Sequence, residues 1–318
     1  MTTACSASMQ RIPGPVVSAA GGANQPGWQP EWRRATPIPI DSPVRRRQEV
    51  AHRLALPGPE PNPRMIPRPL FRWLLSRPGP LGAHAAAYRE WNWGDPHVRL
   101  LRSLCDRRRV SIDVGAHAGS YTWFLRRYSA GCIAFEPNPQ LAAGLHRRFP
   151  TGVDIRNLAL SDRPGSAVLR IPIRSSEPDP GRATIEANNR LDGASGIHAE
   201  IEAEMVTLDQ PVDQPVGFIK IDVEGHELKV LHGGERILVQ DQPNMILELE
   251  DRYNPGIVAT AFAWLGERGY CGWFLQANKM LPISEFDLER HQSAATSANY
   301  VWNFVFSTDP AIGDRLRL

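Results

Sequence analysis

A glycine-rich turn between an apolar strand and a helix constrains this chain more than any other feature. Residues 111–122 read SIDVGAHAGSYT, so a short apolar run leads into a turn that contains Gly115 and Gly119. A second apolar run, residues 132–137, reads CIAFEP and carries an acid at Glu136. A strand, a glycine turn and a helix start place backbone N–H groups where a nucleotide-like ligand can lie. The two strands and the helix between them predict a ribose-binding βαβ unit.

The composition of the 318-residue chain is typical of a globular protein, with 42% hydrophobic and 22% charged residues and a formal net charge of +2. This charge does not indicate nucleic-acid binding, and no stretch approaches the roughly 18 apolar residues of a membrane span. The cysteines are scattered and form no CxxC pair; they are Cys5, Cys105, Cys132 and Cys271. We therefore expect reduced thiols, no disulfide framework and a cytoplasmic protein.

The composition changes along the chain near residue 66. Residues 1–66 are crowded with Pro, Gly, Ala and Arg and follow neither the helix nor the strand period. Such a segment cannot bury enough apolar surface to offset the entropy lost on ordering, so we expect a disordered tail. Residues 67–318 are expected to form one folded domain.

Strand-like and helical patterns alternate through the folded part. We expect strands near residues 110–115, 132–136, 153–159, 217–223, 245–250, 270–275 and 300–307, and helices near residues 97–107, 119–129, 138–148, 227–238 and 256–268. This alternation predicts an α/β fold with a mostly parallel, seven-stranded sheet. The last two strands predict an antiparallel hairpin. Residues 166–173 and 204–208 predict strands in an insertion between the third and fourth strands, and the polar residues 174–201 within it are either mobile or cover the substrate.

The glycine spacing indicates which nucleotide cofactor the turn accepts. A dinucleotide-binding turn needs the pattern GxGxxG, but Asp113 stands where its first glycine belongs, with Gly115 and Gly119 after it. This departure argues against NAD and favours S-adenosylmethionine. A carboxylate at the end of the second strand, Glu136, can accept both ribose hydroxyls.

A second dense site lies in residues 218–228, which read FIKIDVEGHEL. Lys220, Asp222 and Glu224 alternate in an otherwise apolar strand and share one face. Charged groups inside a central parallel strand are costly unless they are paired or functional. One interpretation is a buried Lys220–Asp222 ion pair with carboxylates that cap the next helix. The other is a catalytic group in which His226 also takes part, at the edge where open α/β sheets bind ligands.

The order and content of these blocks resemble the FkbM family of S-adenosylmethionine-dependent methyltransferases. The matching blocks are residues 112–122 (IDVGAHAGSYT), 135–137 (FEP), 157–162 (NLALSD) and 220–227 (KIDVEGHE). The resemblance covers about residues 95–307. It implies a class I methyltransferase fold, with a Rossmann-like sheet, and O-methylation of a sugar, a glycan or a secondary metabolite.

The resemblance also implies roles for individual residues. Those expected to bind the cofactor are Asp113, Gly115, His117, Gly119, Glu136, Asn157, Ala159 and Asp222. The catalytic candidates are Asp222, Glu224 and His226, with His226 as the base because neutral histidine is well matched to proton transfer near pH 7. Glu248, on the fifth strand, is expected at the same edge of the sheet.

Other functions remain open on the sequence alone. A nicotinamide-dependent oxidoreductase would share the first βαβ unit, and an RNA or DNA methyltransferase would share the cofactor. A scaffold without activity could also keep the fold, although it would have no need of Asp222 and Glu224. The spacing of Asp222, Glu224 and His226 permits a divalent metal but does not require one, so no metal is assigned.

Overall fold

The computed structural model describes residues 77, 79–174, 176–191, 197–293 and 300–316. The expected tail, residues 1–66, and the first residues of the expected domain lie outside this part of the chain. In the part that is described, no helix has the length and apolar character needed to cross a membrane.

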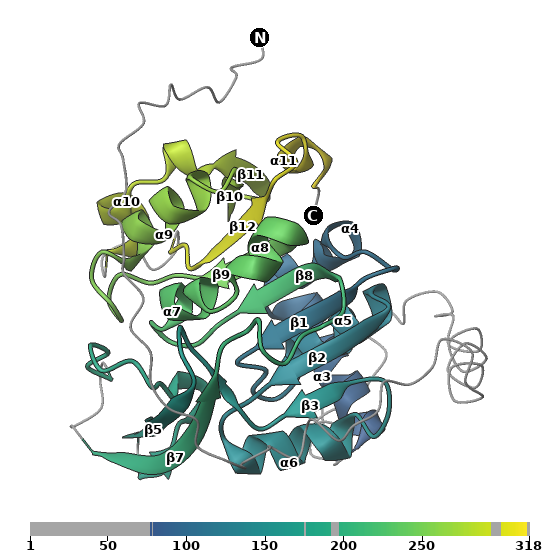
Figure 1. Cartoon of the computed structure of the whole chain (residues 1–318), viewed down its shortest axis with the longest axis vertical. Helices are drawn as coiled ribbons and strands as arrows, with labels where there is room; N and C mark the ends of the chain where they lie inside the picture. Colours follow the sequence, from purple (N-terminus) through teal and green to yellow (C-terminus); the bar gives the residue numbers. More distant parts are fainter. Residues whose placement is uncertain (1–76, 78, 175, 192–196, 294–299, 317–318) are drawn as a thin grey trace, which may run out of the picture. The chain divides into compact units, whose positions relative to one another are not determined.

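The central sheet has eight strands in the order β11-β10-β12-β9-β8-β1-β2-β3 (Figure 1). Five of them, from β9 to β3, are parallel, and the pairs β9–β12, β12–β10 and β10–β11 are each antiparallel. The bounds are β1 Val110–Val114, β2 Gly131–Phe135, β3 Asp154–Arg156, β8 Val216–Ile221, β9 Asn244–Glu248, β10 Cys271–Gln276, β11 Lys279–Pro282 and β12 Asn303–Ser307. The expected α/β class is confirmed, with β11 as one strand more than the seven expected.

The hairpin at the end of the sheet differs in detail from the prediction. β12 pairs with β10, as expected, but it also pairs with β9 and so lies inside the sheet. The edge strand is β11, which forms a tight hairpin with β10. Every residue of β12 is buried, and its three central residues, Phe304–Phe306, are apolar, as expected for a strand inside a sheet.

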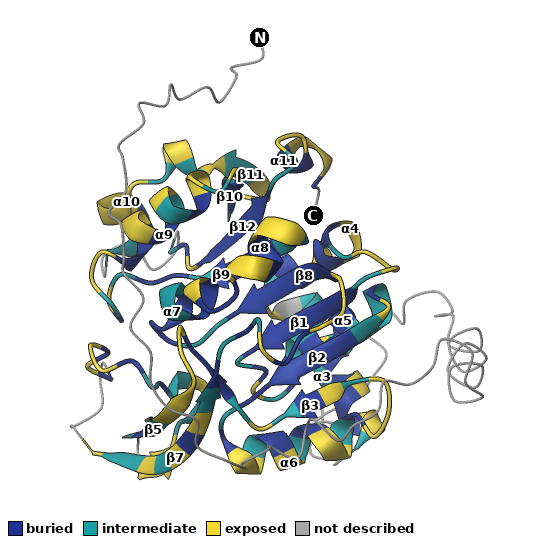
Figure 2. Ribbon diagram, in the orientation of Figure 1, coloured by how far each residue is buried: buried dark blue, intermediate teal, exposed yellow. Residues whose placement is uncertain are grey.

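Helices cover both faces of the sheet, and each face has its own hydrophobic core (Figure 2). Alternate residues of β8 show this division: Phe218 packs in the core beside α5, whereas Ile219 and Ile221 pack in the core beside α7. The helices on the first face are α3 Pro80–Trp93, α4 Leu101–Leu104, α5 Ser120–Tyr128 and α6 Pro139–Arg148. Those on the second are α7 Glu227–His232, α8 Glu235–Gln240 and α9 Ile257–Gly266.

Two of the expected helices are interrupted. Residues 97–107 form a short 3-10 helix, Pro96–Arg99, followed by α4, although Asp95 caps the start as its sequence suggests. The helix expected at residues 227–238 breaks into α7 and α8 at Gly233, where an added Cβ would lie 2.0 Å from the carbonyl oxygen of Ser161. Close backbone contact therefore requires glycine there. Helix α3 was not expected at all.

The insertion forms a second, four-stranded sheet in the order β4-β7-β5-β6. Its strands are β4 Ala159–Leu160, β5 Gly165–Arg174, β6 Glu177–Pro178 and β7 His198–Val206, and β5 pairs with β7 in an antiparallel ladder (Figure 1). The third strand of the main sheet ends at Arg156, earlier than expected, and Ala159 belongs to the second sheet. The remaining elements are η4 Pro180–Arg182, η5 Ile283–Glu285, α10 Leu288–Gln292 and α11 Ile312–Arg315.

Candidate active site

A cavity of about 170 Å³ opens at the carboxyl ends of β1, β2 and β8. This edge is where parallel α/β sheets bind ligands. The predicted site residues that line the cavity are Gly115, His117, Glu136, Ala159, Asp222, Glu224 and His226. Asp113, Gly119 and Asn157 are absent from its lining.

Gly115 allows the first turn to approach β8 closely. Its φ is +76°, and an added Cβ would lie 1.9 Å from the carbonyl oxygen of Asp222. The N–H of Asp222 in turn donates to the carbonyl of Val114 at 3.1 Å. Gly115 thus holds the two halves of the site together, in addition to lining the cavity.

The turn offers fewer free backbone donors than expected. The N–H groups of Gly115 and Ala116 both donate to the carbonyl of Phe135 at 3.0 Å, and that of Gly119 donates to Ala116 at 2.7 Å. The N–H of His117 donates to Oε2 of Glu136 at 2.7 Å. These groups therefore build the turn, and a ligand must rely mainly on side chains and on the helix start.

Glu136 is fixed by backbone groups from both sides. Besides the bond from His117, its Oε1 accepts the N–H of Asn138 at 2.9 Å. Burial raises the pKa of Glu136 to about 7, although these two N–H groups act against the rise. Each carboxylate oxygen keeps a second lone pair for a ligand hydroxyl.

The three remaining predicted residues support the cavity from outside. Asp113 is buried and accepts a hydrogen bond from Thr122. A Cβ added at Gly119 would lie 2.5 Å from the ring of Phe149. The Asn157 amide donates to the carbonyls of Glu136 and Pro137 at 2.8 and 2.9 Å, and so braces the end of β2. Their direct contact with the cofactor stays a prediction.

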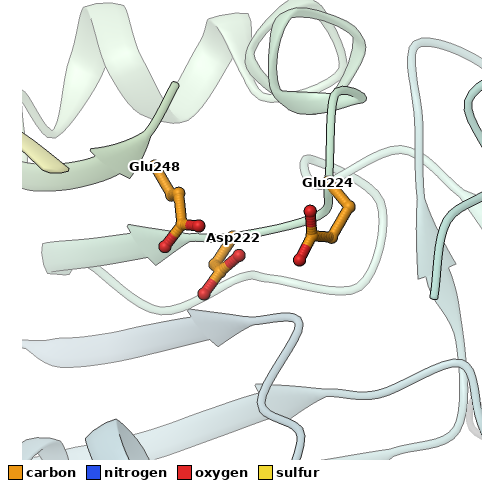
Figure 3. A group of neighbouring side chains, drawn as sticks. All are labelled: Asp222, Glu224 and Glu248. Carbon is orange, nitrogen blue, oxygen red and sulfur yellow. The ribbon is translucent and has the colours of Figure 1, made fainter. Parts of the chain in front are cut away.

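Three carboxylates lie together on the second side of the site, where Asp222 and Glu224 line the cavity and Glu248 lies beside them. Oxygens of Asp222, Glu224 and Glu248 all lie within 4.8 Å of one another, and the side chains converge from the ends of β8 and β9 (Figure 3). We call these three residues the carboxylate cluster. Burial and the nearby Asp222 charge raise the pKa of Glu224 to about 9, and the same two causes raise that of Glu248 well above its usual value.

The insertion fixes the backbone of the cluster. Glu224 has a φ of +54°, in the left-handed region that is unfavourable for a residue with a side chain. Its carbonyl accepts hydrogen bonds from Thr184 Oγ1 at 2.9 Å and from Asn189 Nδ2 at 2.8 Å. The carboxylate of Glu227 accepts the N–H groups of Val223 and Gly225 at 3.2 and 3.0 Å. These bonds, which the sequence did not reveal, hold the turn open toward the cavity.

Lys220 lies behind the cluster on the α5 face of the sheet. Its ammonium is 3.8 Å from Oδ2 of Asp222, donates to Asn303 Oδ1 at 3.1 Å, and lies 5.2 Å from the ring centre of Tyr121. Burial acts to lower the pKa of Lys220, but the charges of Asp222 and Glu248 outweigh burial and raise it. The Lys220–Asp222 ion pair is therefore present, with Lys220 buried and Asp222 partly exposed at the cavity.

His226 lines the cavity but is not placed as a free base. Its Nδ1 lies 2.9 Å from Oε2 of Glu186, and its Nε2 lies 2.9 Å from Oγ of Ser161. Both ring nitrogens are thus engaged, and the side chain is buried. The expectation that His226 takes the substrate proton is not supported by these contacts. Its contacts instead join the insertion to the start of α7.

Part of the insertion forms a wall of the cavity, and its covering of a substrate stays a prediction. The wall residues are Pro180, Gly181, Ala183, Thr184 and Ile185. No chemical motif marks this wall in the sequence; the only signal was the length of the polar segment between two strands.

The predicted position of Glu248 at the same edge of the sheet is confirmed.

Comparisons with known proteins agree with these features. Residues 113–270 match the family model described as a methyltransferase FkbM domain. Hexuronic acid methyltransferase AglP of Haloferax volcanii is 31% identical over 166 residues, 50% of this chain and 63% of that protein, so the chain spans less than two thirds of this relative.

Solved structures align more distantly. Methyltransferase FkbM from Methylobacillus flagellatus has a TM-score of 0.41 and 14% identity, over 75% of this chain and 58% of that one. An O-methyltransferase from Bacillus cereus, in complex with SAH, has a TM-score of 0.34 and 15% identity, over 85% and 91% of the two chains.

Proposed function

Because the chain belongs to the FkbM methyltransferase family, we propose that it transfers a methyl group from S-adenosylmethionine to a hydroxyl group of a sugar. The Haloferax relative is named for a hexuronic acid, so the acceptor class assigned here is an acidic sugar or a glycan that contains one. The observation that carries the proposal is one cavity lined by both Glu136 and the paired acids Asp222 and Glu224. In the strand order these groups flank Gly115, at the first turn.

The lining of the cavity suits the parts of this cofactor. Glu136 has lone pairs left for ribose hydroxyls, and Phe135 and Leu158 provide apolar surface for a base. The Asp222 carboxylate, beside Glu224 in the lining, provides negative charge for a sulfonium. When bound, S-adenosylmethionine supplies a methyl group on a sulfur that is already a good leaving group.

The chain's own residues then position the acceptor and take its proton. Asp222 is the best-placed acceptor of that proton, because it lines the cavity, its side chain is 36% exposed, and His226 is engaged elsewhere. As the oxygen–carbon bond forms and the carbon–sulfur bond breaks, the hydroxyl proton passes to the Asp222 carboxylate. In-line positioning supplies up to about 7–11 kcal/mol, and a positioned base adds about 10²–10⁴-fold.

The proposal is tested by calorimetry and by methyl transfer. We expect S-adenosylhomocysteine to bind the full chain and NAD not to bind. Radiolabel from S-adenosylmethionine should reach a methyl glucuronoside faster than the matching methyl glucoside. Absence of S-adenosylhomocysteine binding would refute the cofactor assignment, and equal labelling of the two glycosides would refute the acidic-sugar assignment.

A further inference from the structure

We propose that Asp222, Glu224 and Glu248 form a binding site for one divalent cation of the Mg²⁺ or Mn²⁺ type. The cation would hold the acceptor sugar through its oxygens. This role rests on the proposed function, whereas the binding of the ion does not. The site differs from the metal alternative considered from the sequence, because Glu248 takes the place of His226.

The geometry of the cluster is that of a small oxygen cage. One carboxylate oxygen from each residue lies within 4.8 Å of the others, a separation that two ligands of a single ion can have when each is about 2.0–2.6 Å from it. The oxygens come from two neighbouring strand ends, with Asp222 and Glu224 after β8 and Glu248 at the end of β9 (Figure 3). An all-oxygen, all-anionic set selects hard cations.

Glu224 supplies a second observation that points to a ligand. Its side chain is directed toward Asp222 (Figure 3), and the residue is only 9% exposed. Its Oε2 is sealed from solvent and accepts no hydrogen bond from any residue that the structure describes. A buried carboxylate oxygen without a partner is costly, and coordination of a cation removes that cost.

The charges around the cluster also leave room for a divalent ion. Two nearby acids have partners for their Oε1 atoms: Glu250 pairs with Arg252 at 2.7 Å, and Glu227 accepts backbone N–H groups. The charge of Lys220 offsets that of Asp222. A divalent cation binds Glu224 and Glu248 in their ionised forms, and its two charges balance theirs.

The cation would also solve a problem of charge in the proposed function. An acidic sugar would be repelled by three carboxylates, but a bound cation can accept both a sugar hydroxyl and a sugar carboxylate as ligands. It favours the ionised form of a bound hydroxyl. Since each cluster residue contributes one oxygen, the second oxygen of Asp222 stays available for the acceptor proton.

The test is a titration of the full chain with Mn²⁺, followed by electron paramagnetic resonance and by calorimetry. We expect one Mn²⁺ per chain. Glu248→Gln and Asp222→Asn should each weaken binding at least about tenfold, because each removes an anionic ligand. Glu204→Gln, at an exposed position on β7, is the matched control and should bind as the unaltered chain does.

Binding of S-adenosylhomocysteine is measured on the same samples. If it binds normally while Mn²⁺ does not bind at millimolar concentration, the cation site is refuted and the proposed function stands. If Mn²⁺ binds equally to all variants, the site is likewise refuted. If the cofactor product does not bind but Mn²⁺ binding depends on Glu248 and Asp222, the cation site stands and the proposed function fails. Retained cofactor binding by a variant also shows that it is folded.

Discussion

The two sides of the cavity satisfy their carboxylates in opposite ways. On the side formed by β1 and β2, each oxygen of Glu136 accepts a backbone N–H group. On the side formed by β8 and β9, the carboxylate cluster has its acids close together, and Oε2 of Glu224 has no described partner. On the first side both carboxylate oxygens have hydrogen-bond donors without a ligand, whereas on the second side one described oxygen has none.

This difference assigns cofactor binding to the Glu136 side and methyl transfer to the carboxylate cluster. Groups that are fully satisfied stay in place when a ligand arrives, and so suit the recognition of an invariant cofactor. Carboxylates that lie close together repel one another, so binding of a cation or a proton stabilises them most. We therefore expect changes on the Glu136 side to affect cofactor affinity, and changes in the cluster to affect turnover.

The largest effect is expected from Asp222→Asn. Removing the proton acceptor should lower turnover by about 10²–10⁴-fold, while S-adenosylhomocysteine binds within a few-fold of its normal affinity. Initial rates and calorimetry measure the two quantities. The exposed Asp213→Asn serves as the control for loss of a charge. Turnover within threefold of normal would remove Asp222 from the chemistry.

The next effect concerns the contact between the two sides. Gly115→Ala places a Cβ against the carbonyl of Asp222 and forces a left-handed residue, so we expect a loss of about 2–5 kcal/mol in the free energy of unfolding. Gly269→Ala is a matched control, because Gly269 has a φ of +81° but no atom within 4 Å of an added Cβ. Chemical denaturation compares them. Equal losses would show that backbone strain alone, and not the contact, requires glycine at 115.

The two sides also differ in what the sequence reveals. The Glu136 side is local: Gly115 and Glu136 follow consecutive strands, so the spacing was enough to place both in one cavity. The cluster side depends on contacts between distant segments. Thr184 and Asn189 reach the carbonyl of Glu224 from the insertion, and no periodicity encodes that contact.

The contacts of His226 show the same dependence on distant segments. His226 follows Asp222 and Glu224 in sequence and looked equally available. Its ring nitrogens are engaged by Ser161 and Glu186, which are far from it along the chain. The α/β class and the antiparallel end of the sheet follow from local apolar patterns, whereas the partners of a buried polar side chain depend on the complete fold.

A smaller effect is expected from Glu136→Gln. The amide keeps the shape of the side chain but presents one hydrogen-bond acceptor fewer, and its NH₂ group faces a backbone N–H. Since hydrogen bonds to charged groups contribute about 1.5–3 kcal/mol, S-adenosylhomocysteine should bind about 10–100-fold more weakly. Binding of Mn²⁺ should be unchanged. Equal weakening of both ligands would show that the two sides do not act separately.

The smallest effect is a pH dependence of stability at the join between the insertion and α7. Burial acts to raise the pKa of Glu186, but hydrogen bonds from His226 and Lys229 outweigh burial and lower it to about 2. The folded state thus favours ionised Glu186, and this stabilisation is present above the unfolded pKa near 4.5 and is lost as the pH falls toward 2.

Glu186→Gln should therefore lower the melting temperature at pH 7 by a few degrees, equivalent to about 1–2 kcal/mol, and the difference from the unaltered chain should shrink between pH 5 and pH 3. Glu204→Gln, which has no described partner for its exposed side chain, should show no such trend. Differential scanning calorimetry across this range measures both. A constant difference at every pH would mean that Glu186 acts by shape alone, and that the insertion is held to the carboxylate cluster by the neutral bonds from Thr184 and Asn189.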